Sequence, residues 1–239
     1  MKKLLVLLFV VSGFVSFAQK ESVVNDPNAT ERTLNESFSS ISVSDGITVY
    51  LSKSDEESIA VSASDPKYLE RYKTEVDNGV LKIYYDNKGI NWTGGERRKL
   101  KAYVSFKNLQ KIHASAGSLV SMKTVLKENE MELIFTSGSN FKGEVDINEL
   151  NATVNSGAEI EMTGKAEKAT LEASSGAIIK GYELITDYCE AKASSGGGIR
   201  INVSKELSVK ANSGGGIRYK GAGVIKDMNV SSGGVVKKG

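Results

Sequence analysis

The sequence predicts an all-β protein, a single-stranded parallel β-helix (β-solenoid) of about 19 residues per coil, with a less regular N-terminal capping region. Three observations predict this fold. A small-polar-glycine step recurs at a nearly fixed interval, and apolar and polar residues alternate around each step. The repeated unit is also too short for a strand–helix–strand unit, which needs roughly 30 residues.

The recurring step occurs seven times, with intervals of 21, 19, 19, 20, 18 and 19 residues between its glycines. A period of this length is typical of repeat architectures. Glycine takes positive φ and tolerates close backbone approach, so we interpret these residues as structural corners, with ligand contact as the alternative. The corner glycines are Gly117, Gly138, Gly157, Gly176, Gly196, Gly214 and Gly233.

The columns around the glycine define the buried face. Residues three and five before it and three after it are apolar in all seven copies, whereas the residue two before it is always Ser, Thr or Asn. Alternation with period two marks strands with one buried face, so equivalent strands should stack in parallel. We therefore expect Val154, Ala173, Ala193 and Ala211 to lie in one file, with Cys189 buried in another. The same parity predicts buried hydroxyls for the serines before the glycines: Ser137, Ser156, Ser175, Ser195, Ser213 and Ser232.

The first 18 residues read as a secretory signal peptide, with two lysines, an apolar run from 4 to 15 and a small-x-small cleavage site at 16–18. The apolar run is too short to span a membrane, so we expect a protein that is exported to the periplasm, outer surface or medium and does not span a membrane. Without Lys2 and Lys3 the chain has 29 basic and 29 acidic residues, which argues against a nucleic-acid partner. One cysteine excludes an internal disulfide.

After the signal peptide, we expect a flexible polar leader at 19–33 and a single domain at 34–239. Its irregular part, 34–108, should cover the exposed edge of the first coil, and the regular coils should occupy 109–239. Within the irregular part the pattern predicts strands at 38–43, 47–51, 58–63, 80–85 and 101–106, a short helix at 66–72 and a hairpin turn at 77–79.

Several stretches, together with the Ser-Gly steps, resemble the bacterial DUF2807 family, the head GIN domain of putative auto-transporter adhesins. They are Asp45–Leu51, Val80–Ile83, Val104–Ile112 and the closing Gly215–Gly221, and the resemblance covers roughly residues 37–236. It implies a secreted or envelope-associated β-helical domain. It carries over no catalytic residues.

We assign no catalytic, metal-binding or cofactor-binding residue and expect no cofactor. The only histidine, His113, falls in an outward column without a nucleophile motif. Carboxylates could still serve a polysaccharide lyase or hydrolase, since some parallel β-helices are such enzymes. The candidate glutamates alternate with lysines, which favours a charge-balanced surface: Glu159, Glu161, Glu172 and Glu190 with Lys168, Lys180 and Lys192.

One outward column, four residues after the glycine, is mostly basic. We call it the basic stripe: Lys142, Lys180, Arg200, Arg218 and Lys237. Its last four members should lie ~5 Å apart with the same sign, so either they extend into water or an anion offsets them. The sequence thus favours a non-enzymatic, adhesin-like or ligand-binding module. Its partner would be acidic polysaccharide, lipid headgroups or another envelope protein, and the alternatives are a polysaccharide-active enzyme and a purely structural envelope protein.

Overall fold

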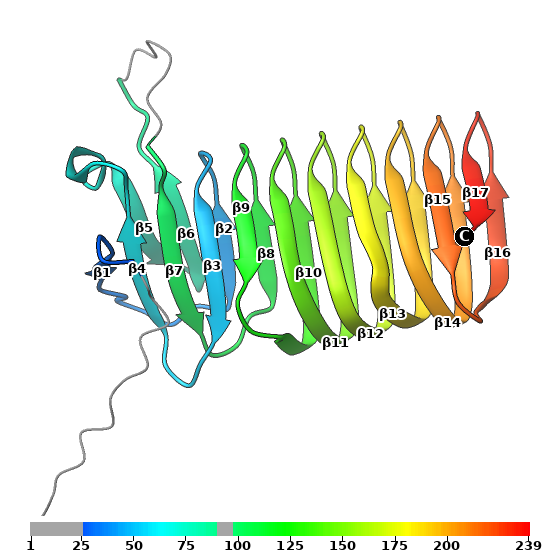
Figure 1. Cartoon of the computed structure of the whole chain (residues 1–239), viewed down its shortest axis with the longest axis horizontal. Helices are drawn as coiled ribbons and strands as arrows, with labels where there is room; N and C mark the ends of the chain where they lie inside the picture. Colours follow the sequence, from blue (N-terminus) through cyan, green and yellow to red (C-terminus); the bar gives the residue numbers. More distant parts are fainter. Residues whose placement is uncertain (1–25, 90–97) are drawn as a thin grey trace, which may run out of the picture.

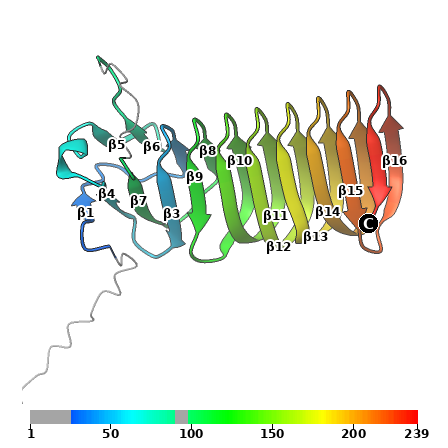
Figure 2. The ribbon, with the colours of Figure 1, turned by 45° about the horizontal axis from the view of Figure 1, so that its top comes forward.

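A computed structural model describes residues 26–89 and 98–239. In these ranges the chain forms one elongated β-solenoid, in which 17 strands make a continuous hydrogen-bonded sheet and the only helix is one short 3₁₀ turn. Figures 1 and 2 show the coils stacked along the long axis, with tight turns along one edge and bends along the opposite edge. The predicted fold class is confirmed. The signal peptide lies outside the described residues.

The regular part consists of parallel strands that each pair with their equivalent one repeat away. Its strands are β8 (Lys111–Ala114), β9 (Leu119–Met122), β10 (Leu126–Phe135), β11 (Asn140–Val154), β12 (Glu159–Ala173), β13 (Ile178–Ala193), β14 (Gly198–Ala211), β15 (Gly216–Lys220), β16 (Val224–Val230) and β17 (Val235–Lys238). The strands from β11 to β14 have 14 to 16 residues because they continue through the bend.

The inward columns form continuous files, as expected. Val154 pairs with Ala173, which is followed in the file by Ala193 and Ala211, and all four are buried. Ile199 is only 1% exposed. Burying an aliphatic side chain contributes about 1.5–3 kcal/mol, so these files supply much of the driving force for stacking.

The corners are two-residue turns in the left-handed conformation. The seven corner glycines have φ between 71° and 75°, and the residue before each has φ between 46° and 54°. Two consecutive positive φ angles define a type I′ turn, and Ser139 accordingly donates its backbone N–H to Thr136 O at 3.2 Å. From Gly117 to Gly214, the N–H of each corner glycine reaches the next coil, as that of Gly138 does to Ser156 O at 3.1 Å. The turns therefore form a hydrogen-bonded file along one edge.

The expected burial of the corner serines is wrong, because the I′ turn interrupts the strand alternation and points them into solvent. The six serines, from Ser137 to Ser232, are exposed. At every corner but the last, the residue after the glycine is buried instead, and the space around this residue decreases along the solenoid. Ser139 Oγ donates to Ala114 O at 2.9 Å, whereas a Cβ added at Gly215 would stand 2.2 Å from Ala193 O. Close coil contact thus explains the extra glycines of the later corners.

The N-terminal part begins with one more coil of the same kind. Its corner is Asp45-Gly46, with φ of 65° and 71°, and Gly46 donates its N–H to Ala116 O at 2.9 Å. Two more strands, at residues 80–85 and 101–106, stack on this coil in parallel, and beyond them antiparallel pairing closes the end of the solenoid. The elements are β1 (Thr30–Arg32), β2 (Ser40–Val43), β3 (Thr48–Lys53), β4 (Ser58–Ser62), the 3₁₀ helix η1 (Pro66–Tyr68), β5 (Tyr72–Asp77), β6 (Val80–Tyr85) and β7 (Lys101–Phe106).

Two expectations for this end need correction. The helix predicted at 66–72 is a single 3₁₀ turn, capped by Asp65, whose Oδ1 accepts the Lys67 N–H at 2.9 Å. The chain then enters β5, because Tyr72–Asp77 pair with β6 in an antiparallel hairpin. The flexible leader expected at 19–33 is wrong for its last part, since β1 pairs with β4. Residues 19–25 lie outside the described residues.

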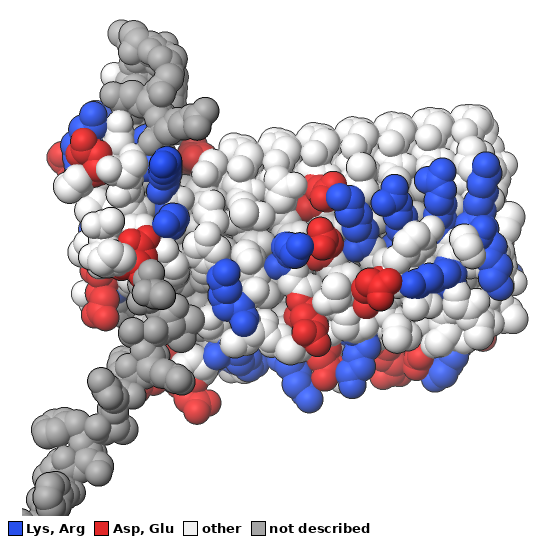
Figure 3. Space-filling view, in the orientation of Figure 1, with Lys and Arg blue, Asp and Glu red and all other residues white. Residues whose placement is uncertain are grey.

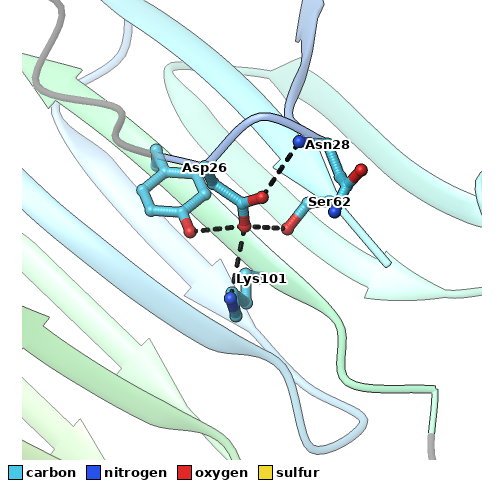
Figure 4. A network of polar contacts seen from close by, with 5 residues as sticks. Asp26, Asn28, Ser62 and Lys101 are labelled. Carbon is cyan, nitrogen blue, oxygen red and sulfur yellow. Dashed lines mark hydrogen bonds and ion pairs between the residues drawn. The ribbon is translucent and has the colours of Figure 1, made fainter. Parts of the chain in front are cut away.

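A polar network fixes the start of the described chain (Figure 4). The carboxylate of Asp26 accepts hydrogen bonds from Tyr103 Oη and Ser62 Oγ, both at 2.8 Å, and from Lys101 Nζ at 3.2 Å. Its other oxygen accepts the backbone N–H of Asn28. These hydrogen bonds, led by that from Tyr103, hold the pKa of Asp26 well below its usual range. Asp26 therefore ties the leader to β4 and β7.

Candidate functional site: the basic stripe

The basic stripe lies on the sheet formed by the first half of each coil. Strand pairing places Lys142 beside Glu161 and Glu161 beside Lys180. Lys180, Arg200, Arg218 and Lys237 then follow one another on β13, β14, β15 and β17. Figure 3 shows a row of blue side chains over these C-terminal coils. The stripe is therefore one straight file along the rod.

Acidic neighbours divide the stripe into two parts. Lys142 Nζ forms an ion pair with Glu161 at 3.0 Å, and Lys180 Nζ forms one with Glu159 at 2.6 Å. Arg200, Arg218 and Lys237 are exposed, and no ion pair joins them to any described residue. Neighbouring strands lie ~4.8 Å apart, so like charges in this part of the file repel one another.

The surroundings of these three cations are also basic. Residues 198–204, 216–220 and 235–239 contain no Asp or Glu. Lys220 pairs with Glu183 at 3.0 Å, whereas Lys238 is exposed and has no ion pair within the described ranges. The C-terminal third of this face thus carries an excess of positive charge, which favours anions.

The opposite sheet differs, because most of its cations form ion pairs, many of them from coil to coil. The alternation of glutamate and lysine read from the sequence is confirmed there: Lys192 Nζ contacts Glu172 at 3.2 Å and Glu190 at 3.0 Å. These two acids, Glu190 first, raise the pKa of Lys192. Further pairs join Lys111 to Glu132, Lys168 to Glu149, Lys205 to Asp187 and Lys226 to Glu206. Exposed pairs contribute only about 0–1 kcal/mol each, but together they neutralise this sheet.

The two tyrosines that begin the column of the basic stripe at its N-terminal end were not identified from the sequence. Tyr50 and Tyr103 are paired in register on β3 and β7, with ring centroids 5.3 Å apart, and Tyr50 pairs with Ser121 on the other side. Lys123 Nζ lies 4.3 Å from the Tyr50 ring centroid. Tyr50 stands four residues after Gly46, so counting Asp45-Gly46 as an eighth corner would have found it.

The other candidates for chemistry stand apart from the stripe. His113 lies in β8, in register between Ser42 and Ile134. Cys189 is buried between Ala169 and Leu207, and burial raises the pKa of its thiol to about 12, so the thiolate is scarce at neutral pH. Within residues 26–89 and 98–239 no three His, Cys, Asp or Glu side chains are grouped closely enough to hold a metal ion. No described helix has the length and apolar character needed to cross a bilayer.

A family model agrees with this geometry. The model of DUF2807, described as "Putative auto-transporter adhesin, head GIN domain", matches residues 37–223. The chain belongs to this family. Since the match runs from β2 to the end of β15, the head GIN domain comprises the first stacked coil, most of the N-terminal cap and nearly all regular coils.

Solved structures share the fold. A protein of Bacteroides fragilis titled a putative adhesin is 17% identical, with a TM-score of 0.77 over 88% of this chain and 95% of that chain. One of Parabacteroides distasonis titled a putative lipid binding protein is 20% identical, with a TM-score of 0.66 over 90% and 97%. A putative adhesin of Parabacteroides merdae is 17% identical, with a TM-score of 0.62 over 90% and 97%. No curated protein sequence matches the chain. These neighbours are named as adhesins or binding proteins and not as enzymes.

Proposed function

We propose that this head GIN domain is an exported, non-enzymatic binding module that holds an acidic polysaccharide of the cell envelope along the basic stripe. One observation carries the proposal. Arg200, Arg218 and Lys237 are successive, exposed and without an acidic partner in the described structure, on a fold in which many other lysines form ion pairs.

The repeat of the fold suits a linear polyanion. Each of the last four coils presents one cation at the equivalent position, so a polymer lying along this part of the rod meets a new cation every ~4.8 Å. An exposed ion pair contributes ~0.2–1 kcal/mol, but contacts along one polymer act together. Such binding should weaken as salt is added, because exposed charges are screened.

A phospholipid surface is the second candidate. Ile178 and Val235 are exposed apolar residues two positions before Lys180 and Lys237 on the same strands, and they could contact acyl chains. The lipid-binding title of one structural neighbour is consistent with this alternative. The polysaccharide remains our choice because the unpaired cations follow one another at a constant spacing along the rod, which suits a linear polymer.

The decisive experiment measures binding to immobilised polygalacturonate by biolayer interferometry at low and high salt. The triple variant Arg200→Ser/Arg218→Ser/Lys237→Ser should lose roughly 10- to 100-fold in affinity, which corresponds to about 0.5–1 kcal/mol per cation. The matched control Lys168→Ser/Lys192→Ser/Lys205→Ser removes the same charge from the opposite sheet and should change affinity less than threefold.

Three results would contradict the proposal. Equal losses in both triple variants would mean that net charge alone attracts the polymer. Stronger binding to phosphatidylglycerol vesicles than to polygalacturonate, lost in the stripe variant, would favour the lipid candidate. Shortening of the polymer during incubation would favour the polysaccharide lyase or hydrolase instead.

A further inference from the structure

The last coil of the described structure is open. β16 and β17 have their neighbours, β14 and β15, on one side only, whereas antiparallel strands close the N-terminal end (Figure 1). Met228 and Val230, which stand in inward columns, are 49% and 44% exposed, although Val209 and Ala211 before them are buried. The core files therefore end at an apolar surface.

The backbone of this coil also has free edges. Val235 and Gly239 donate their N–H groups to Gly215 O and Tyr219 O of the previous coil. Since backbone groups alternate in direction along a strand, those of Val236 and Lys238 face the open end. The file of corner hydrogen bonds ends with Gly214 N–H to Ser232 O, which leaves Gly233 with no next coil to reach.

The charges on this edge restrict what can cover it. Lys237 continues the basic stripe, whereas Lys238 follows Ile201 and Tyr219 in an inward column. An apolar coil stacked on this end would bury the ammonium of Lys238 without a partner, which is costly. A second copy related by two-fold symmetry would bring two pairs of lysines together, and like charges across strands repel. A fitting occupant must bring carboxylates to both lysines.

We propose that the open coil binds an extended acidic segment of a partner polypeptide, which adds one more coil by strand pairing. Apolar residues of the segment cover Met228 and Val230, and two adjacent carboxylates lie beside Lys237 and Lys238. This site lies at the end of the rod and shares only Lys237 with the basic stripe of the proposed function.

The repeat itself supplies the probe. A synthetic peptide of residues 203–221 has the length of one coil, and in it Arg218 and Tyr219 hold the positions that pair with Lys237 and Lys238 in this fold. We would measure binding of this peptide with the substitutions Arg218→Glu and Tyr219→Glu to the full chain by isothermal titration calorimetry. It should bind at least tenfold more tightly than the unsubstituted peptide, and added salt should weaken it.

A second peptide separates strand pairing from charge attraction. In the solenoid Asn212 and Gly216 donate their N–H groups to Ala193 O and Gly197 O of the coil before them. Methylation of these two nitrogens in the acidic peptide keeps its charge but removes the bonds to the open edge. Its affinity should fall at least tenfold, and unchanged affinity would overturn the proposal.

Protein variants locate the site. Lys237→Ser/Lys238→Ser should lower the affinity for the acidic peptide at least tenfold. Arg200→Ser and the control Lys107→Ser/Lys210→Ser should change this affinity less than threefold. The proposal fails if Arg200→Ser weakens the peptide as much as the double variant does. It also fails if sedimentation velocity shows the wild-type chain as a dimer that Met228→Asp dissociates, since a second copy would then cover the end. Polysaccharide binding, read separately, tests only the stripe.

Discussion

The two ends of the solenoid protect their unpaired strand edges in different ways. At the N-terminal end, β1, β4 and β5 run antiparallel to their neighbours and cover the stacked coils, and the Asp26 network holds the first described residues against β4 and β7. At the C-terminal end the last coil keeps the regular pattern and only carries lysines on its edge. Natural sheets use both devices, coverage and edge charge, to prevent strands from pairing with other chains. The difference teaches that one end is closed by structure and the other is protected by charge.

The largest expected effect comes from breaking the core that both ends share. Ile199→Asp removes ~1.5–3 kcal/mol of burial and places a carboxylate in an apolar file, at a further cost of several kcal/mol. The coils around β14 should unfold, which circular dichroism during urea titration would show as a lost or early transition. Lys210→Asp, at an exposed position in the same strand, is the control and should change stability by less than about 1 kcal/mol. Equal stability of both variants would contradict the assignment of inward and outward columns.

Substitutions of the glycines in and beside the corners should differ in their cost to stability, according to the space around each glycine. Gly215→Ala should cost about 2–3 kcal/mol, since the added Cβ would stand 2.2 Å from a backbone oxygen of the previous coil. Gly157→Ala should cost only about 1 kcal/mol, because the site has φ of +71° but open space around it. Urea titration of both variants compares the two costs. A larger loss for Gly157→Ala would show that backbone conformation, and not coil contact, limits this edge.

The closed end should be sensitive to acid. The folded-state pKa of Asp26 lies below its unfolded value of about 3.9, so its stabilisation is present above that pH and is lost as pH falls below it. Asp26→Asn should therefore cost about 2 kcal/mol at pH 7 and progressively less below pH 4. Thermal unfolding of both proteins from pH 7 to pH 3 measures the difference. A gap that stays constant with pH would mean that charge plays no part in the network.

The smallest effect on stability, but a clear one on association, is expected at the open end. Lys238→Val removes the charge from an inward position on the edge and should leave unfolding within about 0.5 kcal/mol of the wild type. The variant should self-associate at concentrations where the wild type does not, as sedimentation velocity would show. Lys210→Val, on the outer face of β14, serves as the control for an added apolar surface residue. Equal association of the two variants would remove the special role of the edge.

Sequence reasoning succeeded where the repeat determines the answer. The file of Val154, Ala173, Ala193 and Ala211 and the burial of Ile199 follow from period-two alternation repeated at a constant interval. It failed at the corner serines because a type I′ turn breaks that alternation, and two positive φ angles cannot be read from parity alone. It also missed the pairing of β1 with β4, since antiparallel contacts between distant residues have no periodic signal.

The candidate site was predictable only in part. Its straight file follows from the column four residues after the glycine, but its division into paired and unpaired cations does not. The ion pair of Lys180 runs diagonally to Glu159, which belongs to a different column, so reading single columns hides it. The unpaired charges of Arg200, Arg218 and Lys237 follow from the positions of side chains in neighbouring coils, which single columns do not give.

The number of stacked coils sets the length of this solenoid. Residues 158–176 form one whole period between Gly157 and Ala177, and each coil touches mainly the coils beside it. Loss of such a period would shorten the molecule by ~4.8 Å without altering any neighbouring turn. It would also remove Glu159 and Glu161 and place Lys142 directly beside Lys180, which would join the separated cations into an unbroken row. Gain or loss of single coils can therefore retune both reach and surface charge of such a protein in one genetic step.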